Sequence, residues 1–222
     1  MERARLKIVL ATIVINVSAV VWFSIVPWSD WRTGMALNFV DNVILAVYAF
    51  KFKDVFMGQL MLFGLGVGIA ELPADAWLVA ATRTLDYSIG GGPMVWRSPL
   101  WMPLAWEIVA VQFGYIGLML WERLGLKGLL AAGALGAVNI PFYEEMALKI
   151  HWWSYRGCRM FLHTPYYIIA GEFLIVLVLG WLARPLRELR WVKSFWCGIV
   201  AGLLIFLCYV VGFWVFEGHI LI

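Results

Sequence analysis

Five carboxylic acids lie inside long hydrophobic stretches of the sequence, where an ionised side chain is costly. They are Glu71, Asp75, Glu107, Glu144 and Glu172. A charged group within the hydrocarbon of a bilayer normally faces the interior of a helix bundle and has a partner or a role there. Glu71 and Asp75 are four residues apart, which places both on one face of a helix. These acids are therefore the first candidates for chemistry.

Carboxyl groups crowded into a medium of low dielectric cannot all ionise, so at least one of the five is expected to stay protonated near neutral pH. A protonated carboxylic acid in a dry cavity is a general acid, and an ionised neighbour can act as the base that completes a reaction. We interpret all five acids as candidate catalytic residues. No Gly-x-Ser-x-Gly or phosphate-binding glycine motif occurs, which disfavours nucleophilic hydrolysis and nucleotide binding.

Aromatic side chains accompany the acids along the chain. The face of an aromatic ring stabilises a positive charge on a bound molecule, although interfacial packing is the simpler explanation for any single ring. Adding two further acids, the sequence predicts a substrate-binding set, which comprises Asp41, Trp77, Trp106, Tyr143, Glu145, Trp152, Trp153 and Tyr167.

A structural explanation competes with catalysis. The acids would pair with basic residues near one end of the helices and hold the bundle together; those residues are Arg83, Arg97, Lys149, Arg156, Arg159, His151 and His163. Pairing is favoured for Asp41, Glu145 and Glu217 individually. It accounts for too few of the acids as a group, because helices in membranes are usually held together by small or uncharged polar residues.

The elements that must position these residues are membrane-spanning helices. The chain is 64% hydrophobic and 14% charged, whereas soluble domains average about 45–50% apolar residues. Its hydrophobic runs approach or reach the roughly 17–25 residues that a spanning helix needs. We expect an all-α integral membrane protein with one domain, residues 1–222, and seven helices at about 7–27, 34–50, 55–83, 98–121, 126–148, 164–183 and 193–217. In this scheme Ser98 caps the fourth helix, and Thr164 has the same place at the sixth. No internal repeat is evident, which disfavours a transporter.

Basic residues set the expected orientation. Eleven Lys and Arg residues fall beside the amino terminus and the even-numbered connections, and six fall beside the odd-numbered ones. By the positive-inside rule the amino terminus is cytoplasmic and the carboxy terminus is outside, in a multi-pass protein of the cell membrane. All five candidate acids then lie in the outer half of the bilayer. The connection from His151 to His163 is expected to cover the mouth of their cavity, with Trp152, Trp153 and Tyr155 inward and Arg156 and Arg159 paired with acids.

Three histidines and three cysteines match no metal-binding motif. No cofactor is therefore expected, with a divalent metal ion on Glu144, Glu145, His151 and His163 as the alternative. Basic residues form no stripe interleaved with aromatics, so nucleic acid is not an expected partner.

Parts of the sequence resemble the membrane-embedded carotenoid hydratases and, more loosely, the small membrane cyclases of carotenoids and meroterpenoids. The similar features are glycines 64, 66 and 68 before Glu71, Tyr87 before the glycine-rich loop 90–93, and Pro103-Leu104-Ala105-Trp106. Pro141-Phe142-Tyr143-Glu144-Glu145 is similar, with one extra residue, to the Pro-x-Glu-Glu signature of heterodimeric lycopene cyclases. The resemblance implies protonation of an isoprenoid double bond or epoxide without a redox cofactor.

The acids, the aromatic residues and the resemblance favour a membrane enzyme that performs acid–base chemistry on an isoprenoid or other lipid. The expected partners are that hydrophobic substrate and the membrane lipids. Two alternatives stay open: a metal-dependent lipid-modifying enzyme, and a non-enzymatic lipid-binding protein, proton-coupled carrier or assembly partner.

Overall fold

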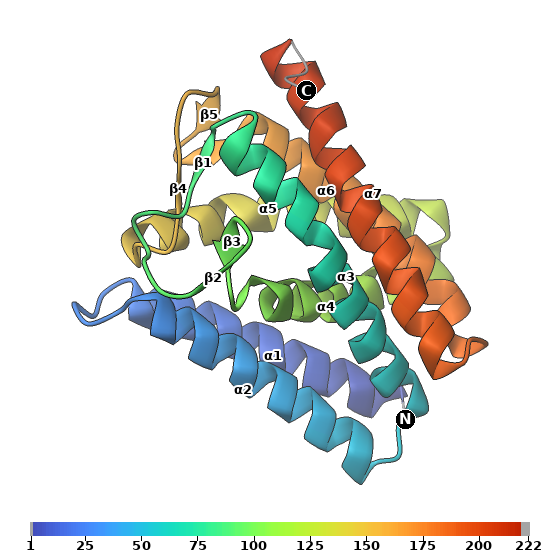
Figure 1. Cartoon of the computed structure of the whole chain (residues 1–222). Coiled ribbons are helices and arrows are strands. Elements are labelled where there is room, and N and C mark those ends of the chain that lie inside the picture. The colour runs from blue at the N-terminus through green and yellow to red at the C-terminus, as the bar shows by residue number, and fades with distance from the viewer. Residues whose placement is uncertain (1, 219–222) are drawn as a thin grey trace.

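Seven helices form the bulk of the computed structural model, which describes residues 2–218 (Figure 1). Each is long and apolar enough to cross a membrane, so the chain is a multi-pass membrane protein, as predicted. The helices are α1 (Glu2–Phe23), α2 (Trp31–Lys51), α3 (Val55–Ala80), α4 (Met102–Leu124), α5 (Leu126–Lys149), α6 (Tyr166–Ala183) and α7 (Trp191–Glu217). A short 3-10 helix, η1 (Arg184–Arg187), precedes α7. The expected position of the carboxy terminus falls on residues 219–222, which lie outside the described residues.

Two predicted helix starts are wrong for the same reason. Ser98 does not cap α4, because Ser98–Pro99 forms strand β3 and pairs with β2 (Met94–Val95). Thr164–Pro165 likewise forms β6 and pairs with β5 (Met160–Phe161). In each case the second strand of a short β-hairpin occupies the residues that we expected to begin the helix.

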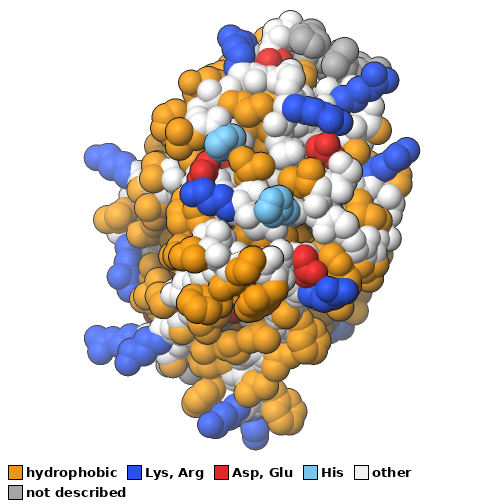
Figure 2. Space-filling model, turned by 90° about the vertical axis from the view of Figure 1, so that its left-hand side faces the viewer, with side chains coloured by type: hydrophobic (Ala, Val, Ile, Leu, Met, Phe, Trp, Pro, Cys, Tyr) orange, Lys and Arg blue, Asp and Glu red, His pale blue; other side chains and the backbone are white. Residues whose placement is uncertain are grey.

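The two ends of the bundle differ in their connections (Figure 1). At one end, here called the turn end, the helices are joined by the short segments 52–54, 125 and 184–190. At the other end, the loop end, they are joined by 24–30, 81–101 and 150–165. Figure 2 looks onto the loop end, where charged side chains of both signs and histidines are scattered among hydrophobic ones.

Glycines let the central helices approach closely. A Cβ on Gly198 of α7 would lie 1.9 Å from the backbone oxygen of Phe63 in α3, and one on Gly202 would lie 2.6 Å from that of Val67. On another side of α3, a Cβ on Gly68 would lie 2.0 Å from the backbone oxygen of Pro103 in α4. Small residues at these crossings let α3 pack against both neighbours, and α3 carries two of the buried acids discussed below, Glu71 and Asp75.

Two segments of the chain repeat the same structure, contrary to the expectation of no repeat. The first runs from α3 to α4 and the second from α5 to α6. In each, a residue with positive φ follows the first helix, Arg83 (φ 56°) in one and His151 (φ 62°) in the other. A short strand comes next, β1 (Leu85–Asp86) or β4 (Ser154–Tyr155), and then the hairpin and the second helix. The hairpins share one register, since Met94 faces Pro99 and Met160 faces Pro165.

The repeats meet through β1 and β4, which pair antiparallel with Asp86 opposite Ser154. Both residues stand three positions after the residue with positive φ, so equivalent positions face each other. This is the pairing that a two-fold axis between the repeats produces. Because α3 and α5 both run from the turn end to the loop end (Figure 1), that axis runs along the bundle, as in proteins with parallel repeats.

The hairpin of α1 and α2 lies outside the repeats and is fastened to them at both ends. At the turn end Arg5 donates to the two carboxyl oxygens of Asp54 over 3.0 and 2.8 Å. At the loop end the indole of Trp152 donates to the backbone oxygen of Asp30 over 3.0 Å. The hairpin therefore closes one side of the space between the repeats.

Candidate functional site

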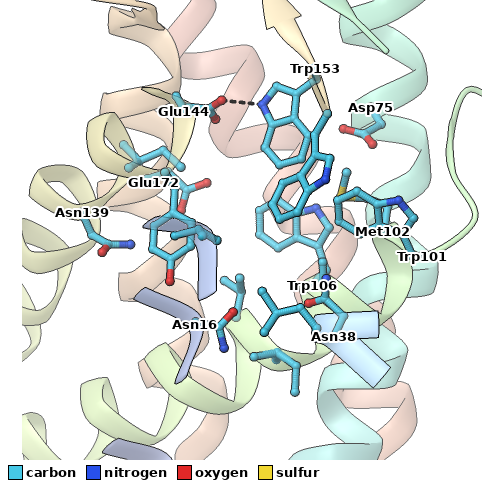
Figure 3. A pocket seen from close by; sticks show the side chains of 18 of the residues that line it. Asn16, Asn38, Asp75, Trp101, Met102, Trp106, Asn139, Glu144, Trp153 and Glu172 are labelled. Atoms are coloured by element: carbon cyan, nitrogen blue, oxygen red, sulfur yellow. Dashed lines mark hydrogen bonds between the residues drawn. The ribbon is translucent and has the colours of Figure 1, made fainter. Parts of the chain in front are cut away.

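A cavity of about 170 Å³ lies among all seven helices toward the loop end (Figure 3). A single water molecule needs only roughly 10–15 Å³, so the cavity has room for a larger molecule. Its wall is largely apolar, and four tryptophans contribute to it: Trp101, Trp106, Trp152 and Trp153. Three of the predicted catalytic acids also line it, namely Asp75 of α3, Glu144 of α5 and Glu172 of α6.

Each of these three carboxyl groups accepts a hydrogen bond from an aromatic side chain. Tyr87 donates to Asp75 over 2.8 Å, and Tyr209 donates to Glu172 over 2.8 Å. Glu144 accepts from the indole of Trp153 over 2.5 Å (Figure 3) and from the hydroxyl of Tyr155 over 3.2 Å. No Lys, Arg or His is among the described residues that line the cavity. The carboxyl groups are thus held by neutral donors and not by cations.

The donors Tyr87 and Tyr155 occupy equivalent positions in the two repeats, four residues after Arg83 and His151 respectively. Both lie in the connections at the loop end, outside the spanning helices. Burial raises the pKa of each phenol well above its usual value, and nearby carboxyl groups raise it further. Both tyrosines therefore stay protonated and act as hydrogen-bond donors at any physiological pH. Each repeat accordingly supplies one such acid–tyrosine pair to the cavity, and the second repeat also supplies Glu172.

Glu71 lies behind this wall. Its side chain is fully buried, and its carboxyl oxygens receive no hydrogen bond from an amide, hydroxyl or cationic group of the described residues, so its hydrogen-bond partner is the carboxyl group of Asp75. It lies close enough to Asp75 and Glu172 to interact with both electrostatically. Glu71 thus belongs to the same acidic cluster, one layer further from the cavity.

Glu107 does not join the cluster, which corrects our expectation of a shared site. It lines a separate groove that opens toward the turn end, together with Lys51, Lys53 and Trp191. The reason is helical geometry, because successive residues on a helix point about 100° apart. On α4, Trp106 and Val109 face the cavity, whereas the Glu107 side chain lies against Gly64 of α3.

The predicted substrate-binding residues divide in the same way. Trp106, Tyr143, Trp152 and Trp153 line the cavity. Trp77 instead packs edge-on against Phe206 and Phe213 of α7, with ring centroids 5.6 and 5.3 Å away. The remaining three, Asp41, Glu145 and Tyr167, are not part of the cavity wall.

Tyr167 is fully buried and its hydroxyl lies 2.7 Å from that of Thr84. Asp41 is fully buried beside Asn16, whose amide donates to it. Glu145 points away from the cavity and pairs with His163 over 2.5 Å and with Lys149 over 3.3 Å. These three residues have structural partners of their own.

The connection from His151 to His163 folds over the cavity, as predicted. Trp152, Trp153 and Tyr155 contribute to its wall. Arg156 pairs with Asp86 over 3.2 Å, and Arg159 lies 3.9 Å from Glu217. Both arginines therefore pair with acids at the rim and leave the acids of the cavity without a cation.

Four uncharged polar residues of the cavity wall were not predicted from the sequence as site residues. Asn16 of α1, Asn38 of α2, Gln112 of α4 and Asn139 of α5 all line the cavity. The available signal was an amide within an apolar run, which is a weaker indication than a charge because its burial costs less.

The four alternative metal ligands do not converge. Glu144 faces the cavity, whereas Glu145 and His163 bond to each other outside it. Between residues 2 and 218, no group of three or more His, Cys, Asp or Glu side chains is arranged to hold a metal ion.

A family model described as Domain of unknown function (DUF6989) matches residues 72–216. The match covers more than half of the chain, which therefore belongs to this family. It includes the three acids of the cavity wall and begins after Glu71 and the α1–α2 hairpin. No curated protein and no solved structure matches the chain.

Proposed function

We propose that this member of the DUF6989 family is a membrane enzyme in which carboxyl groups perform acid–base chemistry on an isoprenoid or other lipid. The observation that carries the proposal is the convergence of Asp75, Glu144 and Glu172 on one tryptophan-lined cavity with no cation in its described wall. The reactions that suit this arrangement are cyclisation, hydration and isomerisation. The proposal rests on the geometry of the cavity and not on the family match.

The lack of a cation decides what the acids do. Three buried negative charges with no positive partner would be very costly, so protons or a positively charged ligand must neutralise them. A protonated carboxyl group can transfer its proton to one carbon of a double bond, leaving a positive charge on the neighbouring carbon. The indole rings can stabilise that charge. An ionised carboxyl group then removes a proton from an adjacent carbon, which restores a double bond and returns the proton to the protein.

The two repeats suggest how the roles divide. Asp75 with Tyr87 and Glu144 with Tyr155 are matching acid–tyrosine pairs. They differ because Glu144 also accepts from an indole, whereas Asp75 lies beside the buried Glu71. Unequal surroundings push paired carboxyl groups toward opposite protonation states, so that one serves as acid and the other as base. The chemistry needs no cofactor.

The orientation of the protein is part of the proposal. Basic residues concentrate at the turn end, so the positive-inside rule puts that end in the cytoplasm and the cavity in the outer half of a cell membrane. A lipid would then enter from the outer leaflet.

Deuterium incorporation tests the chemistry directly. Purified protein in lipid nanodiscs would be incubated in D₂O with a mixture of isoprenoids of different chain lengths, and the products analysed by mass spectrometry. Protonation of a double bond by an exchanged carboxyl group leaves carbon-bound deuterium in the product. We expect Glu144→Gln to abolish incorporation and Glu145→Gln, its matched control outside the cavity, to retain it. Equal incorporation by wild type and Glu144→Gln would contradict the proposal.

A carrier or binding protein is the second candidate, and the internal repeat is the observation that favours it, because many transporters are built from repeats with a site between them. A carrier would bind and release a lipid unchanged. Recovery of every tested lipid without deuterium, together with protein-dependent movement between vesicles, would favour this candidate.

A further inference from the structure

We infer that the cavity recognises a hydroxyl group on its ligand, which donates to one of three amide oxygens on the wall opposite Asp75 and Glu144. The amides belong to Asn16, Asn38 and Gln112, here called the amide wall. Figure 3 shows Asn16 and Asn38 across the cavity from the two acids. The inference rests on the proposed function for the site and names the class of lipid that it takes.

The orientation of the Asn16 amide follows from its partners. Its nitrogen donates to the backbone oxygen of Thr12 over 2.9 Å and to the carboxyl of Asp41. A backbone oxygen can only accept, so the nitrogen must be the atom that faces Thr12. Both N–H groups are then used, and the amide oxygen is left without a partner among the described residues.

Asn38 is fixed by the same logic. Its nitrogen donates to the backbone oxygen of Gly34 over 2.8 Å, which leaves its oxygen free to accept. Its side chain is almost fully buried, so the oxygen has little access to anything except the cavity that it lines.

The orientation of the Gln112 amide, the third of the amide wall, follows from its hydrogen bond with Thr12. The Thr12 hydroxyl donates to the backbone oxygen of Val9 over 2.8 Å, so it can only accept from Gln112. The Gln112 nitrogen accordingly donates to Thr12 over 3.2 Å, and its oxygen remains as an acceptor. Three helices, α1, α2 and α4, therefore each present one unused acceptor.

Unused acceptors in a largely apolar cavity select a ligand that carries a donor. An unsatisfied buried polar group is costly, whereas a ligand hydroxyl would satisfy it and keep its own oxygen available to accept from the free N–H of Asn38. A hydrocarbon brings no donor, and an ether brings only an acceptor. The ligand is thus a lipid alcohol with its hydroxyl at the amide wall and its hydrocarbon beside the acids.

The test compares two ligands that differ by one donor. Binding of tritiated geraniol, a ten-carbon alcohol, would be measured on purified wild-type protein in nanodiscs, with unlabelled geraniol and geranyl methyl ether as competitors. We expect geraniol to compete about five- to tenfold more strongly, the size of one neutral hydrogen bond. Asn38→Leu should remove most of this preference, because Asn38 offers both an acceptor oxygen and a free N–H, and Asn16→Leu should reduce it. Asn42→Leu should retain it, because Asn42 donates only to the backbone oxygens of Asn38 and Leu104 and does not line the cavity.

Equal competition by alcohol and ether on the wild type would overturn the inference, as would a preference that is undiminished in both cavity variants. If Asn16→Leu fails to fold because Asp41 loses its donor, Asn38→Leu decides alone, since its amide bonds only within its own helix. Binding is read without turnover. A preference for the alcohol with no deuterium incorporation would therefore contradict the proposed chemistry and leave this inference intact, and the reverse result would do the opposite.

Discussion

Asp86 and Ser154 face each other across the antiparallel pair that joins the two repeats, although they are far apart in the sequence. Each is followed by the tyrosine that donates to an acid of the cavity, Tyr87 to Asp75 and Tyr155 to Glu144. The strand pair therefore fixes the spacing between the two acid–tyrosine pairs. Asp86 also accepts from Ser88, which holds the pKa of its carboxyl group below the usual range and keeps it charged opposite Arg156.

Neutralising the acids of the cavity should leave the protein as stable as the wild type or more so. Asp75→Asn, Glu144→Gln and Glu172→Gln keep the shape of the side chain and strand no buried cation, because none lines the cavity in the described chain. We expect gains of zero to about 2 kcal/mol. Melting temperatures in detergent check this, and a clear loss in all three variants would identify the acids as a structural network.

The ion pair between Arg5 and Asp54 should behave in the opposite way. Their side chains are 8% and 1% exposed, so removing one partner leaves a buried charge alone. We expect Arg5→Met to cost roughly 3–5 kcal/mol, and the double variant Arg5→Met/Asp54→Asn to recover part of that loss. A single variant that melts like the wild type would show that the pair contributes nothing.

The same pair gives stability a dependence on pH. Burial alone would raise the pKa of Asp54, but hydrogen bonds from Arg5 and from the backbone N–H of Met57 outweigh it and hold the pKa below its usual value. A lowered pKa means that the stabilisation is complete above the unfolded value, about 3.9, and is lost as the pH falls through the folded value. Melting curves from pH 6 downward should show this loss in the wild type, and a smaller one in Asp54→Asn.

Close packing of α3 and α7 predicts a contrast between two glycines. Alanine at Gly198 would place its Cβ 1.9 Å from a backbone oxygen of α3, whereas at Gly114 of α4 the nearest atom would be the backbone oxygen of Leu179 in α6, 3.7 Å away. We expect Gly198→Ala to destabilise by about 1–3 kcal/mol or more and Gly114→Ala to have little effect. Melting temperatures decide, and equal values for the two variants would contradict the packing.

Cys158, in the connection that covers the cavity, should react slowly with alkylating reagents. Burial raises the pKa of its thiol to about 12, and the charge of Glu217 adds to the effect. An ordinary thiol has a pKa near 8.5, and only the thiolate reacts. In a Cys197→Ser/Cys208→Ser background, labelling by iodoacetamide should be slow at pH 8 and rise with each pH unit up to pH 11. Complete labelling within minutes at pH 8 would show that the thiol is not buried in this way.

The sequence alone indicated the helices and half of the site. Apolar runs predicted the seven helices, and the high cost of a buried charge singled out Asp75, Glu144 and Glu172. Periodicity could not separate Glu107 from Trp106, because one residue on a helix turns the side chain by about 100°. Nor did it show the repeat, because few residue types recur at equivalent positions and the main likeness is one of backbone conformation and hairpin register.

The amide wall was beyond prediction for a further reason. An asparagine in a spanning helix is compatible with a bond to its own backbone, and Asn38 and Asn42 both make one. Only Asn38 also faces the cavity, and this depends on how the α1–α2 hairpin sits against α4.

The pairing of β1 with β4 also limits when the parts of the protein can assemble during synthesis. Leu85 is synthesised two full helices before its partner Tyr155, and a chain emerges from the ribosome at roughly 5–20 residues per second. During that interval α3 and α4 must rest in the membrane with the strand unpaired and the buried acids uncovered. Tyr209, the donor to Glu172, follows later still on the last helix. The cavity is consequently among the last features to be completed during biogenesis, so a nascent chain cannot hold a ligand in the finished site before its final helix has been inserted.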